Sequence, residues 1–242
     1  MAATAIIQAR MSSTRLPGKV LESLGDSHVL GWVVRAARQA NTVDHVVVAT
    51  STDATDNSVQ EAAEELGVLV VRGPLDDVLS RFMKVITVRP SDVVVRLTAD
   101  CPLLDPKVID QCVGLLGADN EVDLTTNCLI RTYPRGLDVE VLRRAALERA
   151  DREASGYHRV HVTSWISENT DRFRCAGIVG TLNAQDLRVT VDTPADLEVV
   201  RRCVDALGSG AQDAATLVGW LRANQDVVSL NAHIKQKATD EG

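Results

Sequence analysis

The sequence has few aromatic residues and no long apolar run. Phe, Tyr and Trp together make up 3% of its 242 residues. No apolar run approaches the roughly 18–20 residues that a membrane-spanning helix needs. The opening MAATAII is too short for the apolar core of a signal peptide, and no basic segment precedes it. We therefore expect a protein without a membrane span or a secretion signal.

Basic residues are fewer than acidic ones, and the cysteines form no pattern. Lys plus Arg number 26 and Asp plus Glu 33, which gives a formal net charge of −7. A nucleic-acid-binding protein normally presents a broad basic face, so this balance argues against a nucleic-acid partner. The five cysteines are odd in number and include no C-x-x-C pair. That usage is typical of a reduced, cytoplasmic protein and not of a disulfide scaffold.

The chain is long and apolar enough to form one sizeable domain. Hydrophobic residues make up 45% of it, which is sufficient for a core of its own. No stretch inside the chain has the composition of a linker. We predict a single domain over residues 1–230. The polar string IKQKATDEG predicts a flexible tail over 231–242.

Strand-like and helix-like patterns alternate over the first hundred residues. Nearly continuous apolar runs, typical of strands buried on both faces of a parallel sheet, occur at 4–9, 45–50, 68–72 and 92–98. Apolar residues recur at helical spacing at 29–40, 57–66 and 76–88. This alternation predicts right-handed crossovers and a three-layer α/β domain.

Beyond Asp100 the alternation is less regular. A helix is predicted from Pro106, with Asp105 as its N-cap. Further helices are predicted at 141–154, 160–169 and 213–223, and a strand, a turn and a helix over 187–207. In open sheets of this kind, ligands bind beyond the carboxyl ends of the strands. The loop after the first strand, Asp100 and Asp192 all follow predicted strands, so we expect them at one edge of the sheet.

The loop after the first strand carries three cations, Arg10, Arg15 and Lys19, in an otherwise acidic protein. It is not a Walker A loop, because Val20 follows the Gly-Lys pair, and the chain has no G-x-G-x-x-G fingerprint. Arginine forks bind phosphate oxygens in pairs, and lysine supplies a mobile point charge. Three cations match the charge of a triphosphate. The other reading of this loop is a solvated basic turn without a ligand.

Four strings in this chain resemble the cytidylyltransferases that activate sugar acids. ARMSSTRLPGK resembles their A-R-x-x-S-x-R-L-P-x-K signature, and RLTADCPLLDP, YPRGLDVEV and VTVDTPADL resemble the SpsF-like branch. The resemblance covers about residues 4–206. It implies a GT-A-like, Rossmann-like domain with a mixed, mostly parallel sheet. It also implies transfer of CMP from CTP to an acidic acceptor, a nonulosonic-type sugar acid or a phosphonate, with release of pyrophosphate.

The resemblance also assigns roles at the nucleotide. It implies that the phosphates and the pyrimidine of CTP contact Ala9, Arg10, Arg15, Lys19, Arg72 and Asp100. Among these, Arg10, Lys19 and Asp100 are the expected catalytic residues, and Ala9 and Arg72 lie at the base. Nothing in the composition distinguishes cytosine from uracil.

The same resemblance predicts one Mg²⁺ held by Asp100 and Asp192, since hard cations prefer carboxylate oxygens. Asp100 has a second interpretation as a turn or cap residue before Cys101-Pro102. Near Asp192, helix capping explains Thr193 as N-cap, Pro194 at the first position and Asp196 as the partner in a capping box, but it does not require Asp192.

The acceptor is expected in an insertion at about 120–180, where the residues predicted to bind it are Tyr133, Arg135, Asp138, Glu140, Arg159 and His161. Asp138 and Glu140 are two apart on a predicted strand and so share a face. Asp138 either positions the attacking group or helps to hold metal, and an edge strand with ordinary surface charges is the other interpretation. Val160 stands where relatives commonly carry a glutamate. His158 and His161 lack a third convergent ligand, so we do not expect a zinc site.

Two other functions are compatible with such a fold. A glycosyltransferase that uses a nucleotide-sugar usually carries a D-x-D metal motif, and here the local string is Thr98-Ala99-Asp100. A non-catalytic nucleotide-binding protein would lack one of the key charged residues. A homodimer is possible through apolar positions in 129–142.

Overall fold

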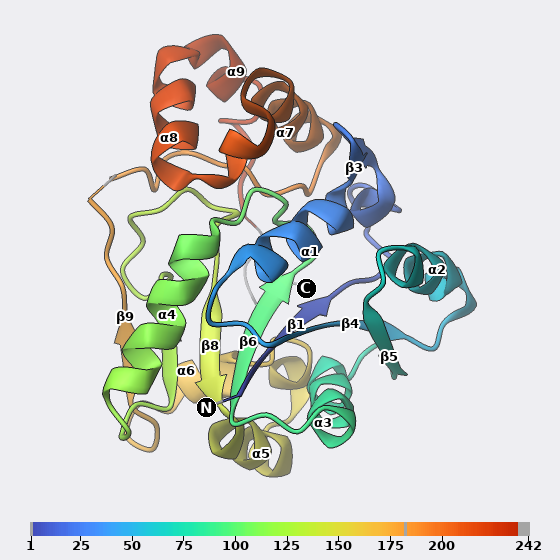
Figure 1. The fold of residues 1–242 in the computed structure, drawn as a ribbon, viewed down its shortest axis with the longest axis vertical. Helices are drawn as coiled ribbons and strands as arrows, with labels where there is room; N and C mark the ends of the chain where they lie inside the picture. Colours follow the sequence, from blue (N-terminus) through green and yellow to red (C-terminus); the bar gives the residue numbers. More distant parts are fainter. Residues whose placement is uncertain (1, 182, 237–242) are drawn as a thin grey trace.

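The computed structural model describes residues 2–181 and 183–236. Its centre is a seven-stranded sheet in the order β5-β4-β1-β6-β8-β7-β9 (Figure 1). The strands are β1 (Ala3–Gln8), β4 (His45–Ser51), β5 (Leu69–Gly73), β6 (Val93–Thr98), β7 (Leu124–Thr126), β8 (Glu140–Arg143) and β9 (Cys175–Gly177). A separate antiparallel pair joins β2 (Ser23–Leu24) to β3 (Ser27–His28).

The sheet is mixed and mostly parallel, as predicted. Strands β5, β4, β1 and β6 run parallel to one another, and Ile6 of β1 lies opposite Val47 of β4 and Arg96 of β6. Strand β8 is antiparallel to both β6 and β7, and β9 is again parallel to β7. The carboxyl ends of β1, β4, β5 and β6 therefore meet at one edge, where the loop with the three cations begins.

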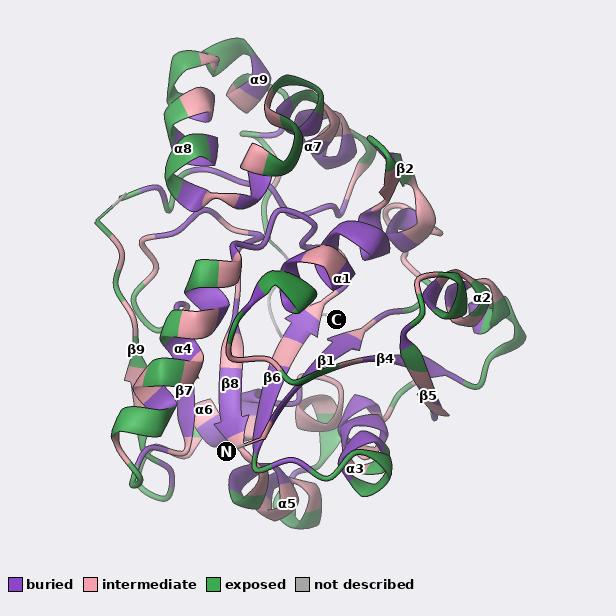
Figure 2. Ribbon diagram, in the orientation of Figure 1, coloured by how far each residue is buried: buried purple, intermediate pink, exposed green. Residues whose placement is uncertain are grey.

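Helices cover both faces of the sheet, which gives the predicted three layers (Figure 1). They are α1 (Val29–Gln39), α2 (Asn57–Glu65), α3 (Val78–Val88), α4 (Pro106–Ala118), α5 (Arg144–Glu153), α6 (Ser164–Glu168), α7 (Pro194–Leu207), α8 (Ala214–Ala223) and α9 (Gln225–Ser229). One apolar core packs α1, α2, α4, α7 and α8 on one face, and a second packs α3, α5 and α6 on the other. Figure 2 shows the buried residues concentrated on the strands between them.

Two helix starts follow their predicted caps. The Asp105 carboxylate accepts the Lys107 N–H at 2.8 Å, with Pro106 at the first position of α4. Thr193 and Asp196 form a capping box at the start of α7, which satisfies backbone donors that the first helical turn leaves unpaired.

Three predicted elements differ in the structure. The helix expected over 141–154 begins only at Arg144, because 140–143 pairs with β6 and β7 as strand β8. Where the strand over 187–191 was expected, only an isolated bridge between Arg135 and Arg188 forms. The helix expected over 160–169 is reduced to α6, preceded by a 3₁₀ turn. At 140–143, pairing with two distant strands overrides the local helical pattern.

Residues 120–180 contribute β7, β8, β9, α5 and α6 to the same sheet and its helix layers. In the predicted tail, Asn231 is buried and its amide donates to Arg188 O and to the Asp196 carboxylate. Residues 237–242, the second half of that tail, lie outside the described residues.

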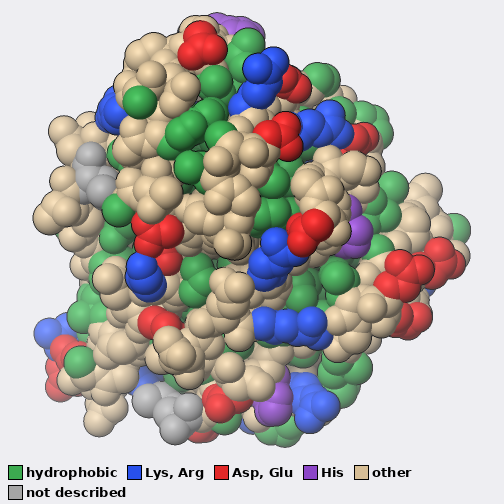
Figure 3. Space-filling model, turned by 45° about the horizontal axis from the view of Figure 1, so that its top comes forward, with side chains coloured by type: hydrophobic (Ala, Val, Ile, Leu, Met, Phe, Trp, Pro, Cys, Tyr) green, Lys and Arg blue, Asp and Glu red, His purple; other side chains and the backbone are tan. Residues whose placement is uncertain are grey.

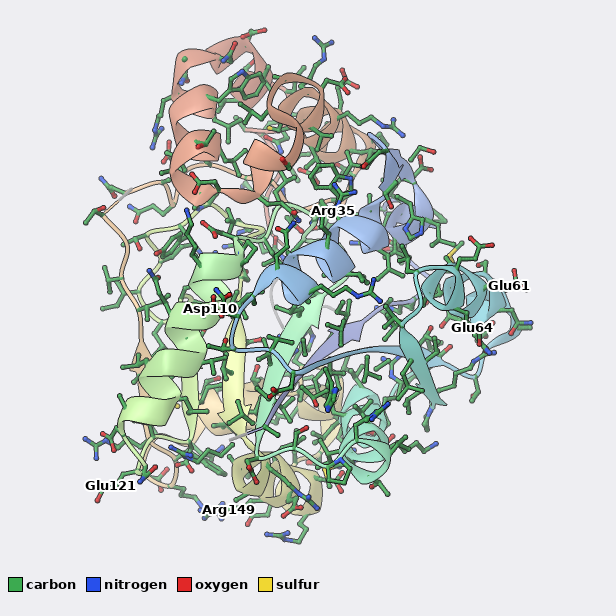
Figure 4. All side chains as sticks on the ribbon, viewed as in Figure 1. Arg35, Glu61, Glu64, Asp110, Glu121 and Arg149 are labelled. Carbon is green, nitrogen blue, oxygen red and sulfur yellow. The ribbon has the colours of Figure 1, made fainter. Side chains whose placement is uncertain are left out.

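The surface carries both signs of charge. On the face in Figure 3, Lys and Arg side chains lie beside Asp and Glu side chains and form no broad basic area. In Figure 4, Asp110 on α4 lies beside the turn before β4, where its carboxylate accepts bonds from Asn41 and Thr42. Within the described ranges, no helix is long and apolar enough to cross a membrane.

Candidate functional site

The loop after β1 is closed on itself at the carboxyl edge of the sheet. The Gly18 N–H donates to Met11 O at 2.9 Å, and Met11 N–H donates to the Asp56 carboxylate at 2.7 Å. Gly18 has φ 74°, a left-handed conformation that disfavours residues with a Cβ. The chain then enters a 3₁₀ turn at Lys19–Leu21. This closure turns the Lys19 side chain back toward the sheet.

Lys19 joins the two aspartates that the sequence singled out. Its Nζ lies 2.7 Å from Asp100 Oδ2 and 2.8 Å from Asp192 Oδ1. Arg15 adds a third contact, with Nη2 3.0 Å from Asp192 Oδ2. The two carboxylates are held together by backbone as well, because Val191 N–H donates to Asp100 O at 2.8 Å. Segments 81 and 173 residues away from Lys19 thus meet at one point.

The charges at this point stabilise one another. Burial disfavours the charged form of Lys19, but the carboxylates of Asp100 and Asp192 outweigh burial and raise the pKa of its ammonium. Burial also opposes ionisation of Asp192, yet Lys19 and Arg15 hold the pKa of its carboxyl below the usual value. Lys19 is therefore a cation and Asp192 an anion at neutral pH.

Arg188 supports Asp192 from the other side and was not predicted. Its Nη2 lies 2.6 Å from Asp192 Oδ2, and its Nε lies 2.8 Å from Asp196 Oδ1. Asp196 is fully buried. The predicted capping residue therefore has a second task, because it also fixes the arginine that orients Asp192. The position of Arg188, four residues before Asp192, was the only signal in the sequence.

The pair of carboxylates suits a divalent cation. Asp100 and Asp192 converge on one ammonium, so both can reach one ion, and two carboxylates with water and phosphate are a usual set for Mg²⁺. Among the residues described, no group of three or more His, Cys, Asp and Glu forms a metal cage. Phosphate oxygens would have to complete the coordination.

A second polar cluster lies beside the first on the α3 side of the sheet. Arg96 of β6 donates from Nε to Gln8 at 3.0 Å and contacts the Glu140 carboxylate through Nη1. Thr163 Oγ donates to the other oxygen of Glu140 at 2.6 Å. Sequence reasoning predicted Glu140 but missed Gln8, Arg96 and Thr163. Gln8 and Arg96 are polar residues inside apolar strand runs, and that interruption was the available signal.

Three of the other predicted acceptor residues, Tyr133, Arg135 and Asp138, lie in the segment before β8, whereas Arg159 and His161 follow it. Asp138 precedes the strand and forms a two-bond fork with Arg131, at 2.6 and 3.0 Å. Tyr133 is buried against Gly180. The Arg135 backbone pairs with the chain at 187–189, next to Asp192. This pairing places the YPRGLD string beside the aspartate pair.

The side chains of Arg72 and Arg159 are already engaged by other residues. Arg72 donates to Ser51 O, Asp53 O, Asn57 and Gln60. Arg159 donates to the carboxylates of Asp77 and Asp151 at 2.9 and 2.8 Å. Ala9 is buried, and its N–H donates to Ala49 O. Among the described residues, none of these three is bonded to Lys19, Asp100 or Asp192.

His161 and Val160 differ in their surroundings. Burial and the Arg96 charge lower the pKa of His161, and its Nε2 is buried without a partner among the described residues. Val160, at the position of the family glutamate, packs against the core on the α3 side. His158 bonds through Nδ1 to Ser164 Oγ at 2.7 Å.

Comparison with known proteins agrees with the geometry. The family model described as cytidylyltransferase matches residues 4–210. The spore coat polysaccharide biosynthesis protein SpsF of Bacillus subtilis is 33% identical over 233 residues, covering 93% of this chain and 95% of that protein. A 3-deoxy-manno-octulosonate cytidylyltransferase of Methylorubrum populi is 30% identical over 238 residues, covering 81% of this chain and 94% of that protein.

A solved structure has the same architecture. The structure of a cytidylyltransferase from Leptospira borgpetersenii superposes with a TM-score of 0.90 at 31% identity, covering 98% of this chain and 100% of that chain. The predicted α/β class, with a mixed sheet between helix layers, is confirmed by this likeness.

Proposed function

This chain belongs to the cytidylyltransferase family, and on that premise we propose that it transfers CMP from CTP to a small acidic acceptor and releases pyrophosphate. The acceptor is a nonulosonic-type sugar acid or a phosphonate. Family membership makes the chain a nucleotidyltransferase. It leaves the two other functions, glycosyl transfer and non-catalytic nucleotide binding, without support.

One observation carries this proposal, the convergence of Lys19 on both Asp100 and Asp192. A triphosphate that enters the loop would meet Arg15 and Lys19, which contact the two carboxylates, and Arg10, which follows β1. Asp100 and Asp192 would hold Mg²⁺, which would supply positive charge against the phosphates. The relatives named above carry names of polysaccharide biosynthesis and of a sugar-acid cytidylyltransferase, which supports an acidic sugar as acceptor.

The residues of the chain act by positioning and electrostatics. An acceptor oxygen attacks the α-phosphorus in line, its new bond to phosphorus forms, and the bond to the pyrophosphate oxygen breaks. A hydroxyl acceptor releases its proton to solvent, whereas an ionised acid oxygen has none to lose. Lys19 and Arg10 stabilise negative charge on the α-phosphate, and Arg15 receives the leaving pyrophosphate. Arg131 and Arg135 offer positive charge to the acid group of the acceptor, while Asp138 keeps Arg131 in place.

The proposal is tested by pyrophosphate release from CTP and Mg²⁺ with a panel of sugar acids and phosphonates. We expect release with at least one acidic acceptor, and none when EDTA removes the metal. A matched control uses the neutral sugar alcohol of each acid. If no acceptor supports release, while a CMP-sugar donor is turned over, the chain is a glycosyltransferase and the proposal is wrong.

A further inference from the structure

Arg81 is a buried guanidinium without a hydrogen-bond partner among the described residues. It lies in the first turn of α3 and is 2% exposed. Its Nε and Nη1 are both buried and unpaired. An unpaired buried charge lowers the stability of a fold, so its retention requires another explanation. Nothing in the mechanism described above uses this side chain.

Arg81 lies across the carboxyl end of β5, at the edge where ligands bind in such sheets. Gly73 ends β5, and a Cβ there would lie 2.7 Å from Arg81 Cγ. The absence of a side chain at position 73 is therefore what gives Arg81 its space. The pKa of Arg81 is lowered to about 10, first by burial and then by the charge of Arg10 at the end of β1. Arg81 is still a cation at neutral pH.

The two carboxylates that face Arg81 are committed to other donors. Asp56 accepts from Met11 N–H and from Ser51. Asp77 caps α3 by accepting from Ser80 N–H and binds Arg159 with its second oxygen. Neither forms an ion pair with Arg81 in the described part of the chain. The free donors of Arg81 therefore need acceptors from a ligand.

The position of Arg81 matches the base end of a nucleotide. Strands β5, β4, β1 and β6 lie side by side, so the ends of β5 and β6 are about 14 Å apart. Lys19 lies at the β6 end, beside Asp100. A nucleotide with its phosphates at Lys19 extends along this edge, and the opposite direction leads to the Arg96–Glu140 cluster on the acceptor side. Its base therefore points toward β5.

Arg72, the predicted base contact, is a poor candidate by comparison. Its Nε, Nη1 and Nη2 all donate to protein oxygens around α2. Arg81 is the arginine near the end of β5 whose donors are unused among the described residues.

We propose that Arg81 donates hydrogen bonds to the pyrimidine of the bound nucleotide, at O2 and N3 of cytosine, in the role expected of Arg72. This inference rests on the proposed function. Cytosine presents two adjacent acceptors, O2 and N3, to a guanidinium that only donates. In uracil, N3 carries a hydrogen and repels a donor. Arg81 therefore selects CTP over UTP.

Calorimetric titration of Arg81→Met tests the inference with three probes. CTP carries base and phosphates, cytidine lacks the phosphates, and inorganic tripolyphosphate lacks the base. We expect Arg81→Met to raise the dissociation constants of CTP and cytidine by about 10- to 100-fold. The dissociation constant of tripolyphosphate should not change. The ratio of the UTP dissociation constant to the CTP dissociation constant, which should exceed one in the parent chain, should fall toward one in Arg81→Met. Lys84→Met, which removes an exposed cation one turn along α3, is the matched control and should change none of these affinities.

Two results would overturn the inference. Unchanged CTP affinity in Arg81→Met would show that Arg81 does not touch the nucleotide. Equal weakening of CTP and tripolyphosphate would place Arg81 at the phosphates and not at the base. Failure of the proposed function itself is distinguishable, because the parent chain would then bind no CTP, and the inference would fail with it.

A purely structural role for Arg81 predicts a different pattern. A structural role predicts that Arg81→Met lowers the melting temperature of the ligand-free protein. A ligand-binding role predicts that this melting temperature is unchanged or raised, because the substitution removes an unpaired buried charge. Gly73→Ala keeps the charge and displaces the side chain, so it should reproduce the loss of CTP and cytidine binding. If Arg81→Met does not fold, the inference is tested with Gly73→Ala instead. Unchanged CTP affinity in Gly73→Ala would then overturn the inference.

Discussion

At the residue scale, Lys19 is the side chain that makes one site out of three distant segments. From the sequence, Lys19 could end a basic turn, Asp100 could cap one, and Asp192 lies next to a helix cap. The structure puts all three within hydrogen-bonding distance. A purely structural role for each residue does not explain why the three side chains meet at one point.

Lys19→Ala should lower the rate of pyrophosphate release by about 10²–10³-fold, because one preorganised charge at the α-phosphate is lost. The measurement is steady-state release from CTP with the preferred acceptor. Lys107→Ala is the control, since the Lys107 ammonium is exposed and is paired with Asp213 and not with Asp100 or Asp192, and it should retain full activity. Near-normal turnover in Lys19→Ala would contradict the role given to it.

Asp192→Asn should make the stability of the protein less dependent on acidic pH. The pKa of Asp192 is lowered in the folded state, so its contribution to stability is present above the ordinary value of 3.8 and is lost as pH falls through the folded pKa. At pH 7 we expect the free energy of unfolding of Asp192→Asn to be about 1–3 kcal/mol lower than that of the parent chain.

The free energy of unfolding of the parent chain and of Asp192→Asn, measured in urea from pH 7 to pH 3, checks this prediction. The difference between them should narrow below about pH 4. A difference that stays constant over the whole range would show that Asp192 is not a stabilised anion.

At the scale of elements, the sequence predicts the first half of the fold better than the second. Strands β1, β4, β5 and β6 are local apolar runs, and the helices between them have clear periodicity, so their identity depends little on context. Strand β8 reads equally well as the start of α5, and only pairing with β6 and β7 decides. The 187–191 segment is extended but pairs through one bridge, which no local pattern encodes.

The residues of the candidate site also fall into two groups, those that the sequence predicts and those that only the structure identifies. Lys19, Asp100 and Asp192 could be predicted because each belongs to a distinct string at the end of an element. Arg188, Arg96 and Arg81 could not, because their meaning depends on what lies opposite them in space. An arginine on a helix is ordinary in sequence, and only its burial without a partner singles out Arg81.

Gly136→Ala tests the packing between the YPRGLD segment and the chain before Asp192. Gly136 has φ 109°, and a Cβ there would lie 2.4 Å from Thr190 N. We expect the free energy of unfolding to fall by about 2–4 kcal/mol, because backbone atoms cannot yield as a flexible side chain can. The measurement is urea unfolding.

Gly114→Ala is the matched control for this change. Gly114 lies within α4, where a Cβ would meet nothing within 4 Å. The same substitution should there be neutral or stabilising by up to about 1 kcal/mol. Equal effects at the two positions would contradict the close approach of Gly136 to Thr190.

At the scale of the whole molecule, the charge distribution suits a small anion and not a polymer. The net charge is −7, and on the face in Figure 3 the Lys and Arg side chains lie among Asp and Glu side chains and form no broad basic area. The expected homodimer stays a prediction. Leu129, Ile130 and Val179 are exposed near the β7–β9 end of the sheet, where a second copy would have to cover them.

The central claim is that the first loop and two aspartates converge on one nucleoside triphosphate around one metal ion. A crystal structure of the chain with CTP and Mn²⁺, with the manganese located by its anomalous signal, tests it most directly. The account predicts a single manganese peak at the carboxylates of Asp100 and Asp192, with the triphosphate against Arg10, Arg15 and Lys19. Manganese and triphosphate bound at another edge of the sheet, away from Lys19, would contradict it.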